Sequence, residues 1–575
     1  MSQDYLSTIG ASVRRSTRLV AATAAIATSA ALVATSATAA TPTDTSGLRD
    51  AVTVDGVMNH ERALQAIADA NGGTRASGTP GYAASVGYVE EQLETAGYDV
   101  TTQEFPFLFF RENSPAEFQR ISPDPEVYVV GTDFVTMEYS GSGDVTGDLT
   151  PIDVQEPPPA TPGSTSGCEA GDFPDPGADF DVALIQRGTC TFFDKAANAE
   201  AAGYDAVVIY NEGQDGRQDT LSGTLGEPVG IPVIGTSYAI GRELLQKDAT
   251  ADGAVVRVRT DTESEERTTW NVIAESTGGR TDRTVVVGAH LDSVLEGPGI
   301  NDNGSGSSTI LEVARQMADT ETTNQVRFAF WGAEESGLVG SEYYVSQLTK
   351  REIKDIAVNL NFDMVGSPNY ARFVYDGDGS DTAVKGPTGS ANVEDVFTDY
   401  FDSQGLVSEP TEFSGRSDYG PFIAVGIPAG GLFTGAEGVK TEEQADPAVF
   451  GGLSTFGTNP DGSARAVAYD PCYHQGCDSL TPDYADQGAD QPYYQGLYTA
   501  LEAEYTNEYG PSPYTGGEYL DGNVNLKGLD EMSDAAAHGT LTFAMTSSAV
   551  GGTAKGGGSS VQTDSMEFKG SHLRK

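Results

Sequence analysis

Basic residues are scarce in this chain, and that scarcity narrows its possible partners. The 575 residues include 84 Asp and Glu but only 33 Lys and Arg, which gives a formal net charge of -51 at pH 7. A surface with this charge repels polyphosphates and anionic membranes. The composition therefore argues against nucleic acid and membranes as partners. It favours a protein that stays soluble outside the cell, with a specific cationic ligand as the alternative explanation.

Long apolar runs are absent after the first forty residues. No later stretch reaches the roughly eighteen consecutive apolar residues of a membrane span. The beginning of the chain has three parts: Arg14, Arg15 and Arg18, then a run rich in Ala, Val and Leu, then the small residues of 37–39. This order is typical of a secretory signal peptide, which we place at 1–39. The sequence predicts a secreted, extracellular protein, and both the general and the twin-arginine export routes remain open.

Cysteine is also rare, and the chain has only Cys168, Cys190, Cys472 and Cys477. An even number of cysteines in an exported chain favours disulfides, and the spacing suggests two local pairs. A zinc–cysteine site is the alternative, but exported proteins seldom keep four reduced thiols.

The length of the chain exceeds one ordinary hydrophobic core, so we expect a large domain with a smaller one inserted. In the segment 81–97, Val86, Val89 and Leu93 share one face, which predicts a helix. From about 104 to 263 the pattern changes to short β-rich pieces broken by Pro and Gly, as in an independent domain.

Strands alternate with helices from residue 284 on. The runs 285–287, 326–331 and 356–362 are almost wholly apolar, and the segment 310–317 has its apolar residues on one stripe. This pattern predicts an α/β fold with a mixed, largely parallel sheet covered by helices. Ligands of such sheets gather where the strands end.

Residue types that bind metals follow the first of these strands. The string AHLDS places His290 and Asp292 there, and Asp302 lies at the centre of the polar loop that comes next. By itself an H-x-D string is a weak signal, because most instances are surface or turn residues.

The next two strands also end in acids. Glu334 and Glu335 follow the second strand, and Asp363 follows the third. Two buried carboxylates side by side repel each other unless a cation is near or one of them is protonated. A cation is the simpler explanation, although a solvated loop would account for the two glutamates alone.

Histidine is scarce enough for each one to be considered, since the chain has only His60, His290, His474, His538 and His572. His474 lies between Cys472 and Cys477, so a disulfide would fix the loop that presents its imidazole. His538 lies in an Ala-rich helical stretch and is predicted to be packed. Two histidines with several carboxylates match the preference of zinc better than that of calcium or magnesium.

Seven ordered strings of this sequence resemble the secreted two-zinc aminopeptidases of peptidase family M28. The resemblance spans about 270–440 and 466–548, and its strings are AHLDS, NDNGSG, GAEESGLVGS, NFDMVG, SGRSDYGPF, GLFTGAE and DPCYHQGCD. It implies a zinc exopeptidase fold and two zinc ions per subunit. The implied metal ligands are His290 and Asp363 for one ion, Glu335 and His474 for the other, and Asp302 as the bridge.

The resemblance also implies roles for neighbouring side chains. Glu334 would be the general base, Tyr473 would hydrogen-bond the developing oxyanion, and Asp292 would orient the imidazole of His290. The substrate would be a peptide with a free amino terminus, bound by a subunit that we expect to be a monomer. Arg416 would position this peptide, while Met364 and Phe433 would line a pocket for a large apolar first residue such as leucine.

The inserted segment has a resemblance of its own. The strings FDVALIQRGTCTFFDKAANAEAAGYDAVVIYNEG and GIPVIGTS resemble a protease-associated (PA) domain, with Cys168 and Cys190 as its disulfide. Such domains are thought to gate access or contact partners, and a purely structural lid is the alternative. We expect the peptidase domain at 50–130 and 263–548, the PA domain at 131–262 and a disordered Gly-rich tail at 549–575.

Two features near the carboxyl end are less specific. Asp530 and Asp534 resemble positions that hold calcium in close relatives, and helix capping is an alternative explanation. A Tyr-rich, acidic insertion around 484–523 departs from compact relatives and would reshape the substrate entrance.

Other functions remain as alternatives to the zinc aminopeptidase. A carboxypeptidase or dipeptidase of the same fold is one, and a relative that cyclises amino-terminal glutamine with one zinc ion is another. A binding protein that has lost catalysis would lack metal ligands, whereas this chain has the full set. A serine hydrolase would need a G-x-S-x-G elbow after a strand, which we do not find.

Overall fold

The computed structural model describes residues 43–177, 180–251, 253–459 and 462–545. The predicted signal peptide, the predicted tail and His572 lie outside the described residues. Within the described ranges, no helix is long and apolar enough to cross a membrane.

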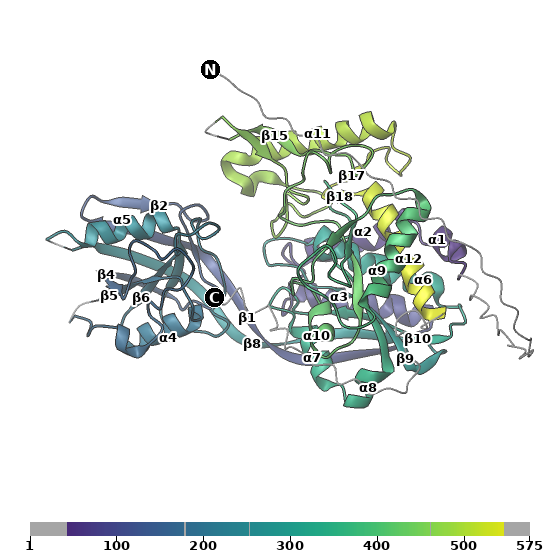
Figure 1. Ribbon diagram of the computed structural model, residues 1–575, viewed down its shortest axis with the longest axis horizontal. Helices are drawn as coiled ribbons and strands as arrows, with labels where there is room; N and C mark the ends of the chain where they lie inside the picture. Colours follow the sequence, from purple (N-terminus) through teal and green to yellow (C-terminus); the bar gives the residue numbers. More distant parts are fainter. Residues whose placement is uncertain (1–42, 178–179, 252, 460–461, 546–575) are drawn as a thin grey trace, which may run out of the picture. The chain divides into compact units, whose positions relative to one another are not determined.

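The peptidase part is built on a mixed sheet whose middle strands are parallel (Figure 1). β9 (Arg280–His290) lies between β10 (Asn324–Trp331) and β11 (Ile356–Phe362), and is parallel to both. Beyond β11, β14 (Ala429–Phe433) is also parallel. The outer strands on that side are β12 (Phe373–Tyr375) and β13 (Glu409–Thr411). This mixed, largely parallel sheet confirms the predicted fold class.

Helices cover both faces of this sheet, as the nearly continuous apolar strands predict. Val285 and Val287 of β9 face one core, and Val286 between them faces another. The first core is formed with α1 (Ser46–Ala51), α2 (Val54–Ala70), α3 (Pro80–Ala96), α6 (Gly306–Met317), α9 (Ser390–Gln404) and α12 (Leu526–Met545). The second is formed with α7 (Val339–Gln347), α8 (Lys350–Asp355) and α10 (Tyr419–Ala424).

The predicted helix over 81–97 is confirmed and shows how local signals set its ends. The side chain of Thr79 accepts the backbone N–H of Tyr82, and Pro80 occupies the first turn. Gly97 ends the helix in a left-handed conformation with φ 94°, which suits glycine.

A long two-stranded ribbon joins the peptidase sheet to the PA part (Figure 1). β1 (Asp99–Ser122) is antiparallel to β8 (Val255–Glu275) along most of its length. One end of β8 pairs with β10, and the other end pairs with β4 (Gly143–Ile152). Side chains of β1 are buried toward both ends of the ribbon: Phe105, Phe107 and Phe109 pack in one cluster with Ala333, and Phe118 packs in a core of the PA part. Cross-strand pairs also stabilise the ribbon.

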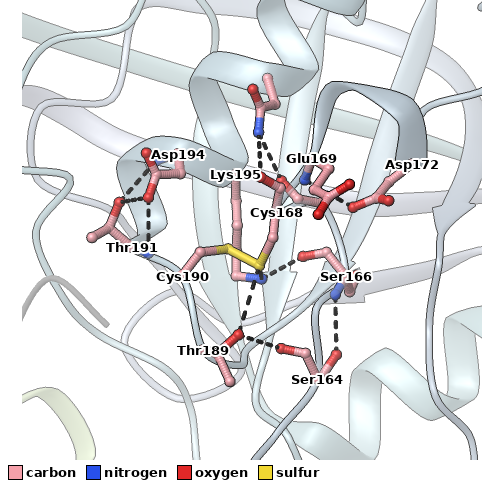
Figure 2. The surroundings of a disulfide bond; sticks show 12 residues. Ser164, Ser166, Cys168, Glu169, Asp172, Thr189, Cys190, Thr191, Asp194 and Lys195 are labelled. Atoms are coloured by element: carbon pink, nitrogen blue, oxygen red, sulfur yellow. Dashed lines mark hydrogen bonds between the residues drawn. A yellow bond between two sulfur atoms is a disulfide. The ribbon is translucent and has the colours of Figure 1, made fainter.

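The PA part continues the sheet with parallel strands that carry a helix layer on each face. Its remaining strands are β2 (Glu126–Tyr128), β3 (Phe134–Thr136), β5 (Asp181–Gln186), β6 (Ala206–Tyr210) and β7 (Val233–Thr236). Its helices are η1 (Ala170–Asp172), α4 (Phe192–Ala202) and α5 (Tyr238–Asp248). Two apolar cores lie on the two faces of β5 and β6. A disulfide joins Cys168 to Cys190, just before α4 (Figure 2).

The Tyr-rich insertion folds mainly as one helix, α11 (Gln491–Tyr509). The other short elements of the peptidase part are β15 (Thr455–Thr458), β16 (Ala464–Ala466), η3 (Tyr484–Asp490), β17 (Leu520–Asp521) and β18 (Val524–Asn525). Asp302 lies in η2 (Ile300–Ser305), between β9 and α6. Tyr505 and Leu497 pack with Tyr370 from the loop after β11, which fixes α11 to the peptidase part.

Candidate active site

Three neighbouring parallel strands deliver the polar residues singled out in the sequence. His290 is the last residue of β9, Glu334 comes three residues after β10, and Asp363 comes directly after β11. Because parallel strands end at the same edge of the sheet, these side chains meet although they are far apart in the sequence.

The first cluster surrounds His290, whose side chain is 2% exposed. Its Nε2 lies 3.2 Å from Oδ1 of Asp302 and 3.3 Å from Oδ1 of Asp363. The second cluster surrounds His474, on the loop closed by the Cys472–Cys477 disulfide. Nε2 of His474 lies 3.2 Å from Oδ2 of Asp302 and 3.1 Å from Oε2 of Glu335.

Asp302 therefore faces both imidazoles, one with each carboxylate oxygen. His290, Asp302 and Asp363 form one group that could hold a metal ion, and Asp302, Glu335 and His474 form a second. Two three-ligand groups that share one carboxylate have the arrangement of a two-metal centre.

The electrostatics of these groups favour a bound cation. Oδ1 of Asp363 and Oε1 of Glu335 are buried, and neither has a hydrogen-bond partner among the described residues. Burial raises the pKa of Glu335 to about 7. Burial opposes protonation of His474, but the carboxylates of Glu335 and Asp302 prevail and raise its pKa to about 12. Imidazole and carboxylate ligands with free, buried oxygens fit zinc better than calcium.

Glu334 lies beside the first cluster without being hydrogen-bonded into it. Its Oε2 is 4.0 Å from Nε2 of His290, and burial raises its pKa well above the usual value. The chain turns sharply just before it, since Ala333 has φ 53° and its N–H donates to Oγ of Ser77. The side chain of Glu334 also lines the cavity over the two clusters.

Asp292 lies behind His290, as expected, but the details differ from the prediction. Nδ1 of His290 is 3.1 Å from the backbone carbonyl oxygen of Asp292 and 3.6 Å from its carboxylate. The carboxylate instead accepts the N–H of Glu334 at 3.3 Å. Asp292 thus contacts both the imidazole and the glutamate that follows β10.

Ser417 and Asn361 hold Asp363, and sequence reasoning missed both. Oγ of Ser417 donates to Oδ2 of Asp363 at 2.5 Å, while Nδ2 of Asn361 donates to Oγ of Ser417 at 2.7 Å. This chain of hydrogen bonds leaves Oδ1 of Asp363 directed at His290. The available signal was the SGRSD string, in which only Arg416 was considered.

Tyr473 and Arg416 lie together at the edge of the site. Nη2 of Arg416 donates to the hydroxyl oxygen of Tyr473 at 3.2 Å, and its Nη1 donates to Oε1 of Glu437 at 2.6 Å. The Tyr473 ring stacks on the imidazole of His474, with centroids 3.9 Å apart. Burial raises the pKa of Tyr473 well above its usual value, so the hydroxyl keeps its proton.

A cavity of about 280 Å³ opens over the two clusters. Met364 and Phe433 line it, and their role as the pocket for the first side chain stays a prediction. Sequence reasoning missed Phe373, which stacks on Phe433 at 6.0 Å, and Tyr469, which meets Phe373 edge to face at 5.3 Å. The carboxylates of Glu412 and Glu437 also line the cavity, so its polar part is mainly acidic.

Asp530 and Asp534 are not brought to this site and contact other residues. Oδ2 of Asp530 accepts the hydroxyl of Tyr514 at 3.1 Å, and Oδ2 of Asp534 lies 3.7 Å from Nη1 of Arg49. Both lie inside α12 rather than at its start, so the helix-capping explanation is wrong.

The remaining described histidines are packed. His538 stacks on Tyr400 and its Nδ1 is 2.8 Å from Oγ1 of Thr45. His60 lies 2.6 Å from the hydroxyl of Tyr88.

Comparison with known proteins identifies the family of both parts of the chain. The model of peptidase family M28 matches residues 271–493, and the model of the PA domain matches residues 145–244. An aminopeptidase of Pseudomonas aeruginosa is 47% identical over 441 residues, which cover 76% of this chain and 78% of that protein. A probable leucine aminopeptidase 2 of Aspergillus fumigatus is 41% identical over 401 residues, or 69% of this chain and 73% of that protein.

Solved structures share the fold. The aminopeptidase from Aneurinibacillus sp. strain AM-1 has a TM-score of 0.61 at 24% identity, covering 87% of this chain and 96% of that one. A zinc aminopeptidase from Bacillus subtilis has a TM-score of 0.53 at 22% identity, covering 87% and 98%. With sequence similarity of this extent, the chain belongs to peptidase family M28 and carries a PA domain.

Proposed function

We propose that this protein is a secreted aminopeptidase that removes a large apolar residue from the free amino end of peptides with two zinc ions. The observation that carries the proposal is Asp302, whose two carboxylate oxygens face His290 and His474 at 3.2 Å each. His290 and Asp363 would hold one ion, and Glu335 and His474 the other. Asp302 would bridge them. Bound zinc would polarise the scissile carbonyl and lower the pKa of a water molecule.

The side chains of the protein would then move the protons. Glu334, whose carboxylate has no cation hydrogen-bonded to it among the described residues, would take a proton from the attacking water and pass it to the leaving amine. Arg416 donates to the hydroxyl oxygen of Tyr473, which leaves the hydroxyl proton free to turn into the cavity. There it would donate to the oxygen on which negative charge develops.

The cavity favours an amino end over a carboxyl end. Glu334 and Glu412 line it without a paired Arg among the described residues, and their charge suits an ammonium group. Arg416, which could otherwise bind a carboxylate, is already paired with Glu437. Of the two expected specificities, the aminopeptidase is therefore better supported than the carboxypeptidase. The aromatic wall formed by Phe373 and Phe433 would receive the first side chain.

The proposal is tested with leucine para-nitroanilide and its amino-acetylated form, using purified mature protein with and without a chelator. We expect cleavage of the free amine alone, its loss on chelation, its recovery with zinc, and two zinc ions per chain. Cleavage of the acetylated substrate would contradict the amino-end specificity. Activity that survives removal of all metal would contradict the metal mechanism.

A further inference from the structure

A buried polar frame lies behind the second metal cluster, and part of it comes from the segment beyond the family match. The frame consists of Asp470 and Asp478, which flank the His474 loop, together with Asn301, Asn523 and Tyr498. Asp470, Asp478, Asn301 and Asn523 are each at most 2% exposed, and Tyr498 is 8% exposed. Residues 271–493 match the peptidase model, so Tyr498 and Asn523 lie outside it.

Asp478 ties the His474 loop to the loop of the bridging aspartate. Its Oδ1 accepts the backbone N–H of Asn301 at 2.8 Å, and its Oδ2 accepts that of Asp302 at 2.9 Å. Asp478 directly follows Cys477, whose disulfide closes the loop of His474. A shift of Asp478 would therefore move Asp302 relative to His474.

Asp470 holds the other side of the same loop. Its Oδ1 accepts the N–H of Cys472 at 2.8 Å, and its Oδ2 accepts Nδ2 of Asn301 at 2.6 Å. Asp470 and Asp478 thus enclose the His474 loop and share Asn301 as a partner.

Asn523 joins the two carboxylates. Its Nδ2 donates to Oδ1 of Asp478 at 2.8 Å and reaches both oxygens of Asp470 at 3.1 Å. The Tyr498 hydroxyl donates to Oδ1 of Asn523, which fixes the amide with its NH₂ group toward the acids. Without this donor, two buried carboxylates would face each other with fewer hydrogen bonds, and such a loss is costly.

We propose that Asn523 is a positioning residue for the Asp302–Glu335–His474 metal site, and that Tyr498 orients it. The inference rests on the proposed function and deepens it: the Tyr-rich insertion, which contributes none of the described residues that line the cavity, supports the second ion from behind. Loss of a direct outer partner of a metal ligand typically weakens metal binding about 10- to 100-fold. Asn523 acts one contact further out, through Asp470 and Asp478, so we expect the lower end of this range, about 10-fold. The effect should be larger for the ion held by Glu335 and His474, because the frame contacts the His474 loop as well as the shared Asp302, but not Asp363.

The test compares zinc binding by the full mature chain and its Asn523→Leu variant, which removes the amide at similar volume. The number of zinc ions bound per chain and the dissociation constant of each ion are measured by competition with a chromophoric chelator. We expect the variant to bind one of the two ions about 10-fold more weakly and to bind the other with an affinity closer to that of the wild type. Activity should return at correspondingly higher zinc concentration, with a lower kcat at limiting zinc and little change in KM. Equal zinc affinities in the two proteins, with only a lower melting temperature, would overturn the inference.

Two milder variants, Tyr498→Phe and Tyr505→Phe, provide the test if Asn523→Leu does not fold. Tyr498→Phe removes only the hydroxyl that orients the amide, so a smaller weakening of the same ion is expected. Tyr505→Phe is its matched control on the same helix, since the buried hydroxyl of Tyr505 has no hydrogen-bond partner among the described residues. Identical zinc affinities in these two variants would refute the role of the frame. A wild-type protein that binds no zinc would instead refute the proposed function, along with the inference that rests on it.

Discussion

The acidic residues that follow parallel strands are hydrogen-bonded differently in the two parts of the molecule. In the PA part, Glu212 follows β6 and is fully buried, but its Oε1 accepts the N–H groups of Gly163 and Ser164, each at 2.8 Å. Its Oε2 accepts Nη1 of Arg217 at 2.9 Å. In the peptidase part, buried oxygens of Asp363 and Glu335 have no such partners within the described ranges. An acid at a strand end is therefore not enough to indicate a metal site; the indication here is a group of carboxylates around an imidazole that also has free, buried oxygens.

The balance of charge in the metal clusters also differs from that around a buried lysine of the PA part. Lys195 in the PA part is fully buried beside the Cys168–Cys190 disulfide and donates to the carbonyl oxygen of Ser166 (Figure 2). The Lys195 ammonium thus has a local hydrogen-bond partner and serves the structure of the PA part. In the peptidase part, carboxylates outnumber the imidazoles that face them, so the site has charge left to bind a cation.

The largest effect should come from Glu334→Ala. Removing a general base typically costs about 10²- to 10⁴-fold in rate, so kcat should fall to that extent. Zinc content should remain near that of the wild type, since the proposed ligands are intact. Glu412→Ala, which removes a second and exposed carboxylate of the same cavity, should instead raise KM with little change in kcat. Full activity of Glu334→Ala, measured with leucine para-nitroanilide, would show that another group is the base.

Ser417→Ala should weaken the site through Asp363. The variant loses the hydrogen bond to Oδ2 of Asp363, so the carboxylate can rotate away from His290. We expect zinc affinity to fall about 10- to 100-fold for the ion near His290, measured by chelator competition. Ser414→Ala, in the same loop and lining the same cavity, should leave zinc affinity unchanged. Parallel behaviour of the two variants would mean that Ser417 does not position Asp363.

The sequence predicted the elements whose signals are local and missed contacts between distant polar residues. The apolar runs predicted β9, β10 and β11, and Gly97 predicted the end of α3. The full extent of the β1–β8 ribbon was not predicted, because strand pairing over more than a hundred residues has no local pattern. The contacts of Ser417 and Asn523 were missed for the same reason: their partners lie 45 to 56 residues away.

Removing the PA part would show whether it limits access to the site. Glu112 and Thr262 lie opposite each other in the ribbon, so joining them through a short Gly-Ser turn should leave the β1–β8 pairing below them intact. Phe110 should be replaced by Thr in this variant, because its ring packs against Tyr139 of the removed part at 5.5 Å. We expect the variant to keep more of its kcat/KM for leucine para-nitroanilide than for long peptides. An equal loss on both substrates, at normal zinc content, would indicate a structural role.

The smallest effect concerns stability at high pH and should come from Lys195→Met. Burial lowers the pKa of Lys195 to about 8, whereas an exposed lysine has a pKa of about 10.4. Between these values the unfolded chain binds a proton that the folded protein does not, so this group makes stability rise with pH. The difference in pKa corresponds to about 3 kcal/mol of unfolding free energy; the wild type has this whole increment above about pH 10.4 and none of it below about pH 8.

Urea unfolding at pH 7.5 and at pH 10 measures this increment. From the lower to the higher pH, the unfolding free energy should change by a more positive amount in the wild type than in Lys195→Met, because all other ionisable groups are shared. Leucine para-nitroanilide hydrolysis at pH 7.5 should be the same in both, since Lys195 is not among the residues that line the active-site cavity. Equal changes in unfolding free energy would mean that Lys195 stays protonated in the fold, stabilised by the carbonyl of Ser166.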